Sequence, residues 1–126
     1  MTFPPTLEVM YGAATVIAAS ASAAVAIDCG NYEDVRVLVC GTKTAATDTL
    51  TVDLLCQTAA TGVTGVALAT AATFTAWAAA NDYSQLRKVP RDLIVGGFLK
   101  ARVVVTGGTP SSRCQVLLLG WKKYTR

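Results

Sequence analysis

Residues 34–58 read D-V-R-V-L-V-C-G-T-K-T-A-A-T-D-T-L-T-V-D-L-L-C-Q-T, and this stretch is the most informative about the fold. Residues 34–40 are short, β-branched and followed by Gly41-Thr42, so they predict a strand that ends in a turn. Residues 49–58 alternate between apolar and polar side chains, with Leu55 as the exception, which is typical of a half-buried strand. The apolar face of that strand would hold Leu50, Val52, Leu54 and Cys56. The polar link at 43–48 favours an antiparallel hairpin between the two strands.

Similar signals continue along the chain. Residues 83–89 predict a strand closed by Pro90, and residues 92–106 predict a long one with a bulge or bend at Gly96-Gly97. In that long strand Leu99, Ala101, Val103 and Val105 would face one side, and Lys100 and Arg102 the other. Residues 114–121 predict a last strand, joined to the preceding one by a hairpin with the longer loop 107–112.

The remaining segments have weaker patterns. Residues 7–27 predict one or two strands, residues 28–31 a turn, and residues 66–77 a strand pair. Residues 1–6 contain Pro4 and Pro5 and predict an extended N-terminal arm. Short strands separated by turn signals favour an all-β fold, either an antiparallel β-sandwich or a jelly-roll. A length of 126 residues suits one domain, 1–126.

The composition excludes several classes of protein. Hydrophobic residues make up 52% and charged residues only 15%, against about 25% charged in ordinary soluble domains. This balance argues against disorder. The chain has no His, which removes the commonest general base and metal ligand, and its net charge is only +3. We therefore expect a protein that is not an enzyme and does not bind nucleic acid.

Few residues are candidates for chemistry. Asp48 and Asp53 lie five positions apart, and Glu33 adjoins Asp34, but such residues are expected to be solvated at turns and strand exits. The oxygen side chains Asp28, Asn31 and Asp34 are too few for a calcium loop. We therefore expect no catalytic, cofactor-binding or metal-ligating residues, and no cofactor.

The four cysteines lack CxxC spacing, and they are Cys29, Cys40, Cys56 and Cys114. They could form two disulfides in three ways. The first ten residues contain no Lys or Arg, so a secretory signal is not expected. Reduced thiols that act as small hydrophobic side chains are therefore favoured.

Two long stretches, 9–27 and 54–81, lack any charged residue. They are rich in Ala, Thr and Gly rather than in Leu, Ile and Phe, so we expect neither to insert into a membrane. Interface cores are depleted in charge, and we expect the core and the subunit interfaces to lie in these stretches. Two small basic groups are expected to be solvated or to dock an acidic partner, and they comprise Arg87, Lys88 and Arg91 and then Lys122, Lys123 and Arg126.

Three segments carry a resemblance to a known class. They are V-R-V-L-V-C-G-T-K-T-A-A-T-D-T-L-T-V-D-L at 35–54, G-F-L-K-A-R-V-V-V-T-G-G-T-P-S-S at 97–112 and V-L-L-L-G-W-K-K at 116–123. This pattern of strands and turns resembles small virion proteins of tailed bacteriophages. The resemblance implies a β-sandwich or jelly-roll that sits on an icosahedral head as a decoration (cement) protein, often a trimer.

The partners that this resemblance implies are the major capsid protein and further copies of the chain. The location would be the capsid surface, after assembly in the host cytoplasm, and the work would be to stabilise the head. A neck, tail-tube or head-fibre component is an alternative structural role. An alternative of another class is a carbohydrate-binding attachment module, whose aromatic platform would use Trp77, Tyr83, Trp121 and Tyr124.

Overall fold

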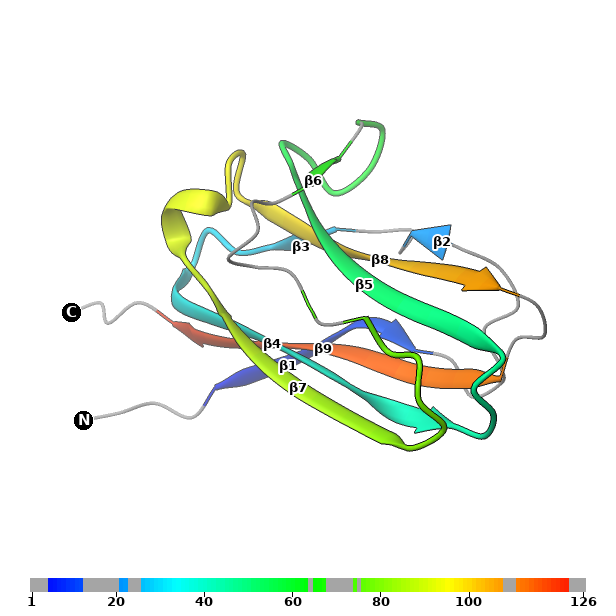
Figure 1. Cartoon of the computed structure of the whole chain (residues 1–126). Helices are drawn as coiled ribbons and strands as arrows, with labels where there is room; N and C mark the ends of the chain where they lie inside the picture. The colour runs from blue at the N-terminus through cyan, green and yellow to red at the C-terminus, as the bar shows by residue number, and fades with distance from the viewer. Residues whose placement is uncertain are drawn as a thin grey trace.

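Two antiparallel sheets lie face to face in the computed structural model of the protein (Figure 1). The structure describes residues 5–12, 21–22, 26–63, 65–67, 74, 76–107 and 111–122. Sheet A has the order β1-β9-β4-β7, formed by β1 (Thr6–Gly12), β9 (Ser112–Lys122), β4 (Tyr32–Lys43) and β7 (Asp82–Val89). This arrangement confirms the predicted antiparallel β-sandwich.

Sheet B is built around two long central strands. Its order is β2-β8-β5-β6, and β3 also pairs with β8. The strands are β2 (Ala21–Ser22), β3 (Ile27–Asp28), β5 (Asp48–Gln57), β6 (Val66–Ala67) and β8 (Phe98–Gly107). A short 3-10 helix, η2 (Arg91–Leu93), precedes β8. Within the described residues no helix is long and apolar enough to cross a membrane.

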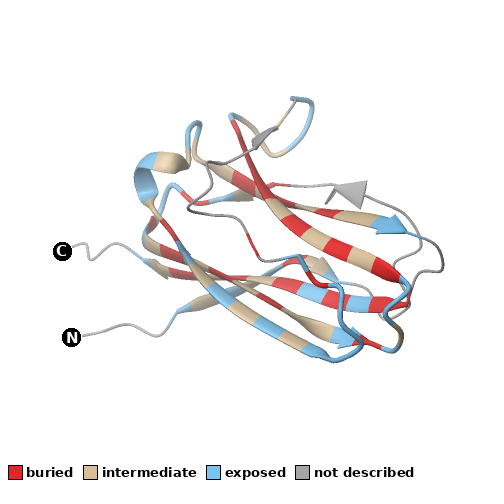
Figure 2. Cartoon of the chain, in the orientation of Figure 1, coloured by how far each residue is buried: buried red, intermediate tan, exposed pale blue. Residues whose placement is uncertain are grey.

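The core lies between the sheets and follows the alternation of the sequence. Inward-facing side chains recur at every second position of the four longest strands, which gives the bands of buried residues in Figure 2. They include Val35, Val37, Val39, Val116 and Leu118 from sheet A and Leu50, Val52, Leu54, Leu99, Ala101 and Val103 from sheet B. The predicted apolar faces of residues 49–58 and 98–106 are therefore confirmed.

Both predicted hairpins are wrong. β4 belongs to sheet A and β5 to sheet B, so the link between them crosses from one sheet to the other. The link from β8 to β9 makes the same crossing in the opposite sense. Each strand turns one apolar face inward. When the two sheets pack together, the apolar face of sheet A and the apolar face of sheet B are buried against each other. The hydrogen-bonding partners come instead from distant strands, because β4 pairs with β9 and β5 with β8.

Two predicted strand ends also differ from the structure. β4 does not turn at Gly41 but stays paired with β9 as far as Lys43. Gly41 lies so close to β9 that any side chain there would collide with the Arg113 carbonyl group, so the close approach of the two strands requires glycine at this position. The predicted strand at 92–106 begins only at Phe98. Gly96 and Gly97 have φ angles of +88° and +86°, which form a turn rather than a bulge within a strand.

The expectations for the weaker segments meet mixed outcomes. Residues 7–27 contain β1, β2 and the start of β3 among their described residues. The proposed arm at 1–6 lies mostly outside the described residues, and Thr6 already belongs to β1. Of the strand pair predicted at 66–77, the structure describes β6 and a single bridge between Trp77 and Leu50, while 68–73 and 75 lie outside the described residues.

The charge-free stretches are predicted to hold the core and the subunit interfaces, and the described residues bear only on the core part, which is partly right. Leu54 and Trp77 are buried, but Val9 is 63% exposed and residues 78–81 are exposed. Most of the described core comes from β4, β8 and β9, which carry charged residues on their outer faces. Alternation along a strand, rather than absence of charge over a stretch, decides which side chains are buried.

Candidate interaction surface

The outer face of sheet A carries a row of aliphatic side chains that crosses all four strands. Val9 of β1 lies opposite Leu117 of β9, Leu117 opposite Leu38 of β4, and Leu38 opposite Leu86 of β7. Side chains that are directly opposite in antiparallel strands point to the same side of the sheet. We call these four residues the aliphatic row. Its outer members are highly exposed, with 63% of Val9 and 50% of Leu86 accessible to solvent.

A second row beside it is apolar at one end and basic at the other. Leu7, which is 60% exposed, lies opposite Leu119, which in turn lies opposite Arg36, and Arg36 lies opposite Lys88. The Arg36 guanidinium carbon lies 5.2 Å from the ring centroid of Trp121, a cation–π distance. The apolar surface is therefore wider over β1 and β9, and cations border it over β4 and β7.

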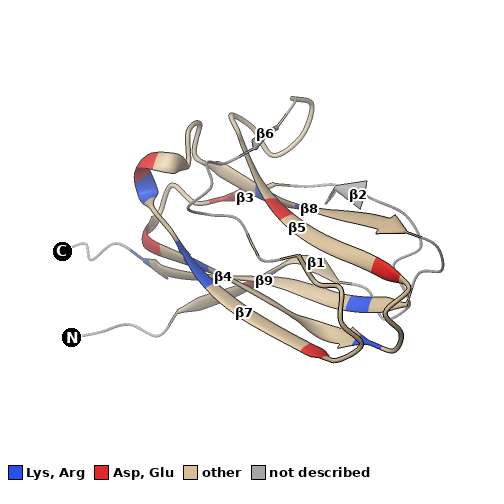
Figure 3. Ribbon diagram, viewed as in Figure 1, with Lys and Arg blue, Asp and Glu red and all other residues tan. Residues whose placement is uncertain are grey.

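One carboxylate accompanies these cations. Asp34 forms ion pairs with Arg36 at 3.4 Å and with Lys88 at 3.9 Å. Elsewhere on the ribbon charged residues occupy few positions (Figure 3). The basic group predicted at Arg87, Lys88 and Arg91 does not form one patch, because the adjacent residues Arg87 and Lys88 point to opposite faces of β7. Lys123 and Arg126 of the other predicted basic group lie outside the described residues.

The outer face of sheet B has a different character. Asp53 accepts a hydrogen bond from Arg102 at 2.8 Å, and the two residues lie opposite each other on β5 and β8. Thr51 and Thr49 continue this face along β5, opposite Val104 and Thr106. The two outer faces therefore differ in polarity, and the aliphatic one is the candidate for contact with another protein.

A buried polar cluster closes the end of the sandwich where both inter-sheet links cross. The Lys43 ammonium lies 2.5 Å from Oδ1 of Asp48, and both side chains are completely buried. Asp48 also accepts hydrogen bonds from the Ser111 N–H at 3.3 Å, the Ser111 hydroxyl at 2.8 Å and the Ser112 hydroxyl at 3.1 Å. Lys43 donates a second bond to Ser112 at 3.1 Å. We call these four residues the buried polar cluster.

The ionised form of Asp48 is stabilised inside this cluster. Burial by itself raises the pKa of Asp48. The hydrogen bonds from Lys43, Ser111 and Ser112 outweigh this effect, so the pKa falls below its usual value, to about 2. The expectation that Asp48 is a solvated turn residue is therefore wrong. A carboxylate that is closed to solvent and bound by four donors holds the two links together rather than exchanging protons with a substrate.

The cysteines have the predicted state. All four are free, and Cys29, Cys56 and Cys114 are buried. Burial raises the pKa of Cys29 to about 12 and that of Cys114 to about 11. These thiols therefore remain protonated near neutral pH and pack as small hydrophobic groups.

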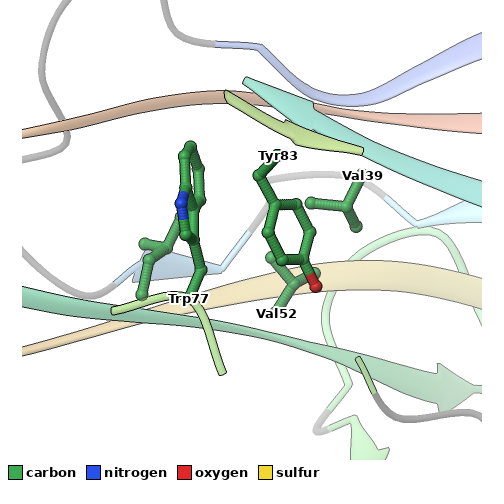
Figure 4. Close-up of a pocket in the computed structure, with 5 residues that line it drawn as sticks. Val39, Val52, Trp77 and Tyr83 are labelled. Atoms are coloured by element: carbon green, nitrogen blue, oxygen red, sulfur yellow. The ribbon is translucent and has the colours of Figure 1, made fainter. Parts of the chain in front are cut away.

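The aromatic residues do not meet on one surface. Trp77 and Tyr83 stack on each other with ring centroids 4.9 Å apart, next to Val39 and Val52 between the sheets (Figure 4). Only 3% of Trp77 is exposed, and its indole N–H donates to Asn81 at 3.0 Å. Trp121 lies on the outer face of sheet A, and Tyr124 lies outside the described residues. The proposed sugar platform is therefore not formed by the described aromatic residues.

The described residues contain no group of three or more His, Cys, Asp or Glu side chains placed to hold a metal ion. The carboxylates considered for calcium have other roles. Asp28 accepts a hydrogen bond from the Gly30 N–H at 2.8 Å within its turn, and Asp34 pairs with the cations beside it.

The fold is similar to part of a viral particle chain. No protein-family model and no curated protein matches the sequence. A chain of the T13 particle of infectious bursal disease virus matches 95% of this chain with a TM-score of 0.51 and 15% sequence identity. Chains of the Gx and Gt strains of the same virus match with TM-scores of 0.47 and 0.44 at 15% identity. This chain spans about a third of those chains, 32% to 34% of their length. At this identity the likeness concerns the fold alone.

Proposed function

We propose that this chain is a virion structural protein, a capsid decoration protein of the tailed-bacteriophage type that binds the major capsid protein and stabilises the head. The observation that carries the proposal is the aliphatic face of sheet A. A β-sandwich that exposes Leu and Val across four strands is suited to burying that surface against another subunit. The fold likeness to a chain of a viral particle supports the same role.

The proposal assigns the chain a mechanical task without a catalytic step or a cofactor. Residues 1–126 act as one β domain. The partners are the major capsid protein and further copies of this chain on the capsid surface, after assembly in the host cytoplasm. Many weak contacts repeated by symmetry give a large total stabilisation.

The test compares particles assembled with and without the chain. Both are heated, and DNA release is measured against temperature. We expect particles that carry the chain to release DNA at a higher temperature, and purified chain added back to restore that temperature. Equal DNA retention with and without the chain would contradict the proposal.

Two variants make this test specific for the surface. Leu86→Arg places a charge in the aliphatic row, whereas Thr106→Arg places the same charge on the exposed outer side of β8 in sheet B. We expect Thr106→Arg to stabilise particles as the unmodified chain does, and Leu86→Arg to lose that effect. The copy number per particle separates this role from a neck role, which needs a dozen copies or fewer.

A further inference from the structure

We propose that the outer face of sheet A packs against the same face of a second copy of this chain, about a two-fold axis that runs across the strands along the aliphatic row. This inference rests on the proposed function: it assigns the self-association within that role to the aliphatic face, as a dimer in place of the trimer that the resemblance implies, and leaves the other surfaces of the dimer to bind the major capsid protein. It is argued from the registers, exposures and charges of the four strands.

The aliphatic row is suited to such an axis. A two-fold axis along the row places Leu86 over Leu86 and Leu117 over Leu117 of the second copy, so apolar groups meet across the whole width of the sheet. Two sheets that pack face to face keep their strands roughly aligned and about 10 Å apart. Leucine side chains from both sides fill a layer of that thickness.

The charges on the same face are arranged so that they complement a second copy. Every second residue of β7 faces outward. In chain order these residues are Asp82, Ser84, Leu86 and Lys88. The proposed two-fold rotation places β7 of the second copy antiparallel over β7 of the first. Lys88 then lies over Ser84 of the second copy, with Asp82 of that copy one step further along the strand.

The other half of the face repeats this relation. Arg113 lies on the outer side of β9, two rows from the aliphatic row, and Asp34 lies at the same distance on the opposite side, on β4. The axis places Arg113 of one copy over Trp121 of the other, next to Asp34 on the adjacent strand β4. A two-fold axis parallel to the strands would instead place β7 over β1 of the second copy, so that Lys88 would lie over Leu7 with no carboxylate opposite it.

The size of the face is close to what a dimer needs. Four strands about 4.8 Å apart, each roughly ten residues long at about 3.4 Å per residue, form a face of roughly 600–700 Å². A stable interface buries about 800 Å² on each partner. The proposed contact therefore uses nearly the whole outer face of sheet A.

The experiment measures the mass of the purified full chain by native mass spectrometry and by sedimentation over a concentration series. We expect a dimer, a loss of affinity of at least tenfold in Leu86→Arg, and unchanged affinity in the control Thr106→Arg. Circular dichroism melts of each variant show whether it is folded. A monomer or a trimer of the unmodified chain overturns the proposal, and so does a dimer that Leu86→Arg leaves intact.

A charge exchange tests the two-fold arrangement without touching the aliphatic row. Lys88→Glu is expected to weaken the dimer several-fold, because the introduced carboxylate would lie one step from Asp82 of the second copy. Adding Asp82→Lys should recover the lost affinity, since the pair is then reversed. A double variant as weak as Lys88→Glu overturns the two-fold arrangement.

The outcomes separate this inference from the proposed function. A dimer that does not change the DNA release of particles leaves the inference standing and contradicts the decoration role. A monomeric chain that stabilises particles supports the decoration role and overturns the inference.

Discussion

Asp48 and Asp53 lie on the same strand, five residues apart, and each forms an ion pair with a basic residue from another strand. The Lys43–Asp48 pair is completely buried at 2.5 Å, whereas the Arg102–Asp53 pair is 2.8 Å long with 41% and 25% of its side chains exposed. Asp48 accepts three further hydrogen bonds from Ser111 and Ser112. The two pairs share their chemistry and differ in their surroundings.

The difference shows what burial does to an ion pair. A buried pair has lost its hydration, so each partner depends on the other and on the surrounding hydrogen bonds. In an exposed pair each charge exchanges contact with water for contact with its partner, and the two are of similar free energy. The net contribution of such a pair to the free energy of unfolding is therefore small. Asp48 therefore stabilises the fold by joining two inter-sheet links, and Asp53 adds charge to the outer face of sheet B.

The largest effect is expected from Asp48→Ala. The substitution leaves the Lys43 ammonium buried with no carboxylate beside it, and this should lower the free energy of unfolding by about 3–5 kcal/mol. Urea denaturation at pH 7 measures the loss. A loss below about 1 kcal/mol would mean that Asp48 and Asp53 contribute equally to stability, and would contradict the conclusion that burial makes the two ion pairs differ.

A smaller effect is expected when both charges are removed together. The double variant Lys43→Met with Asp48→Leu buries two apolar side chains of similar length, so no unpaired charge remains. It should be more stable than Asp48→Ala by about 1–3 kcal/mol, although the Ser111 N–H loses an acceptor. The same denaturation assay, arranged as a double-mutant cycle, gives the coupling between the two residues. A double variant that is no more stable than Asp48→Ala would contradict the view that the loss in Asp48→Ala comes from the unpaired charge of Lys43.

Acid should act through the buried pair. The pKa of Asp48 is lowered to about 2 in the folded protein, below the value of about 3.9 in an unfolded chain. The stabilisation from its ionised form is therefore complete above about pH 4 and is lost as the pH falls through about 2. Denaturation midpoints measured from pH 5 to pH 2 should fall more steeply for the unmodified chain than for Asp48→Ala. Parallel curves would show that another group governs the acid response.

The smallest effect is expected from Asp53→Asn. Removing one charge of an exposed pair should cost less than about 1 kcal/mol. Because ions screen exposed charges, the cost should decrease further between low salt and about 1 M salt. Denaturation at the two salt concentrations measures it. A cost similar to that of Asp48→Ala would show that the sheet B pair is buried by something else, such as a partner.

The sequence predicts the strands well because alternation is a local property. The apolar faces of residues 49–58 and of residues 98–106 follow directly from it. Had the alternation been extended beyond the strand ends, it would have separated the two aspartates. Lys43 is in phase with Val39, and Asp48 is in phase with Leu50, so both point inward, whereas Asp53 is in the opposite phase.

The partners of each strand could not be predicted in this way. Links 43–48 and 107–112 have the length and polarity of hairpin loops, yet each crosses between sheets. The choice depends on contacts with strands far away in sequence, which a local pattern does not contain. The aliphatic row was missed for the same reason, because its residues come from four separate segments. The run of leucines at 117–119 was a visible signal, since one strand cannot bury both of its faces in a two-layer fold.

The buried polar cluster also has a consequence for the rates of folding and unfolding. Its hydrogen bonds to Ser111 and Ser112 join residues that are 63 to 69 positions apart, so these bonds can form only after long loops have closed. Interactions that are absent from the transition state slow unfolding and leave folding almost unchanged. We expect Asp48→Ala to raise the unfolding rate far more than it lowers the folding rate in stopped-flow measurements. The cluster would then lengthen the lifetime of each folded chain.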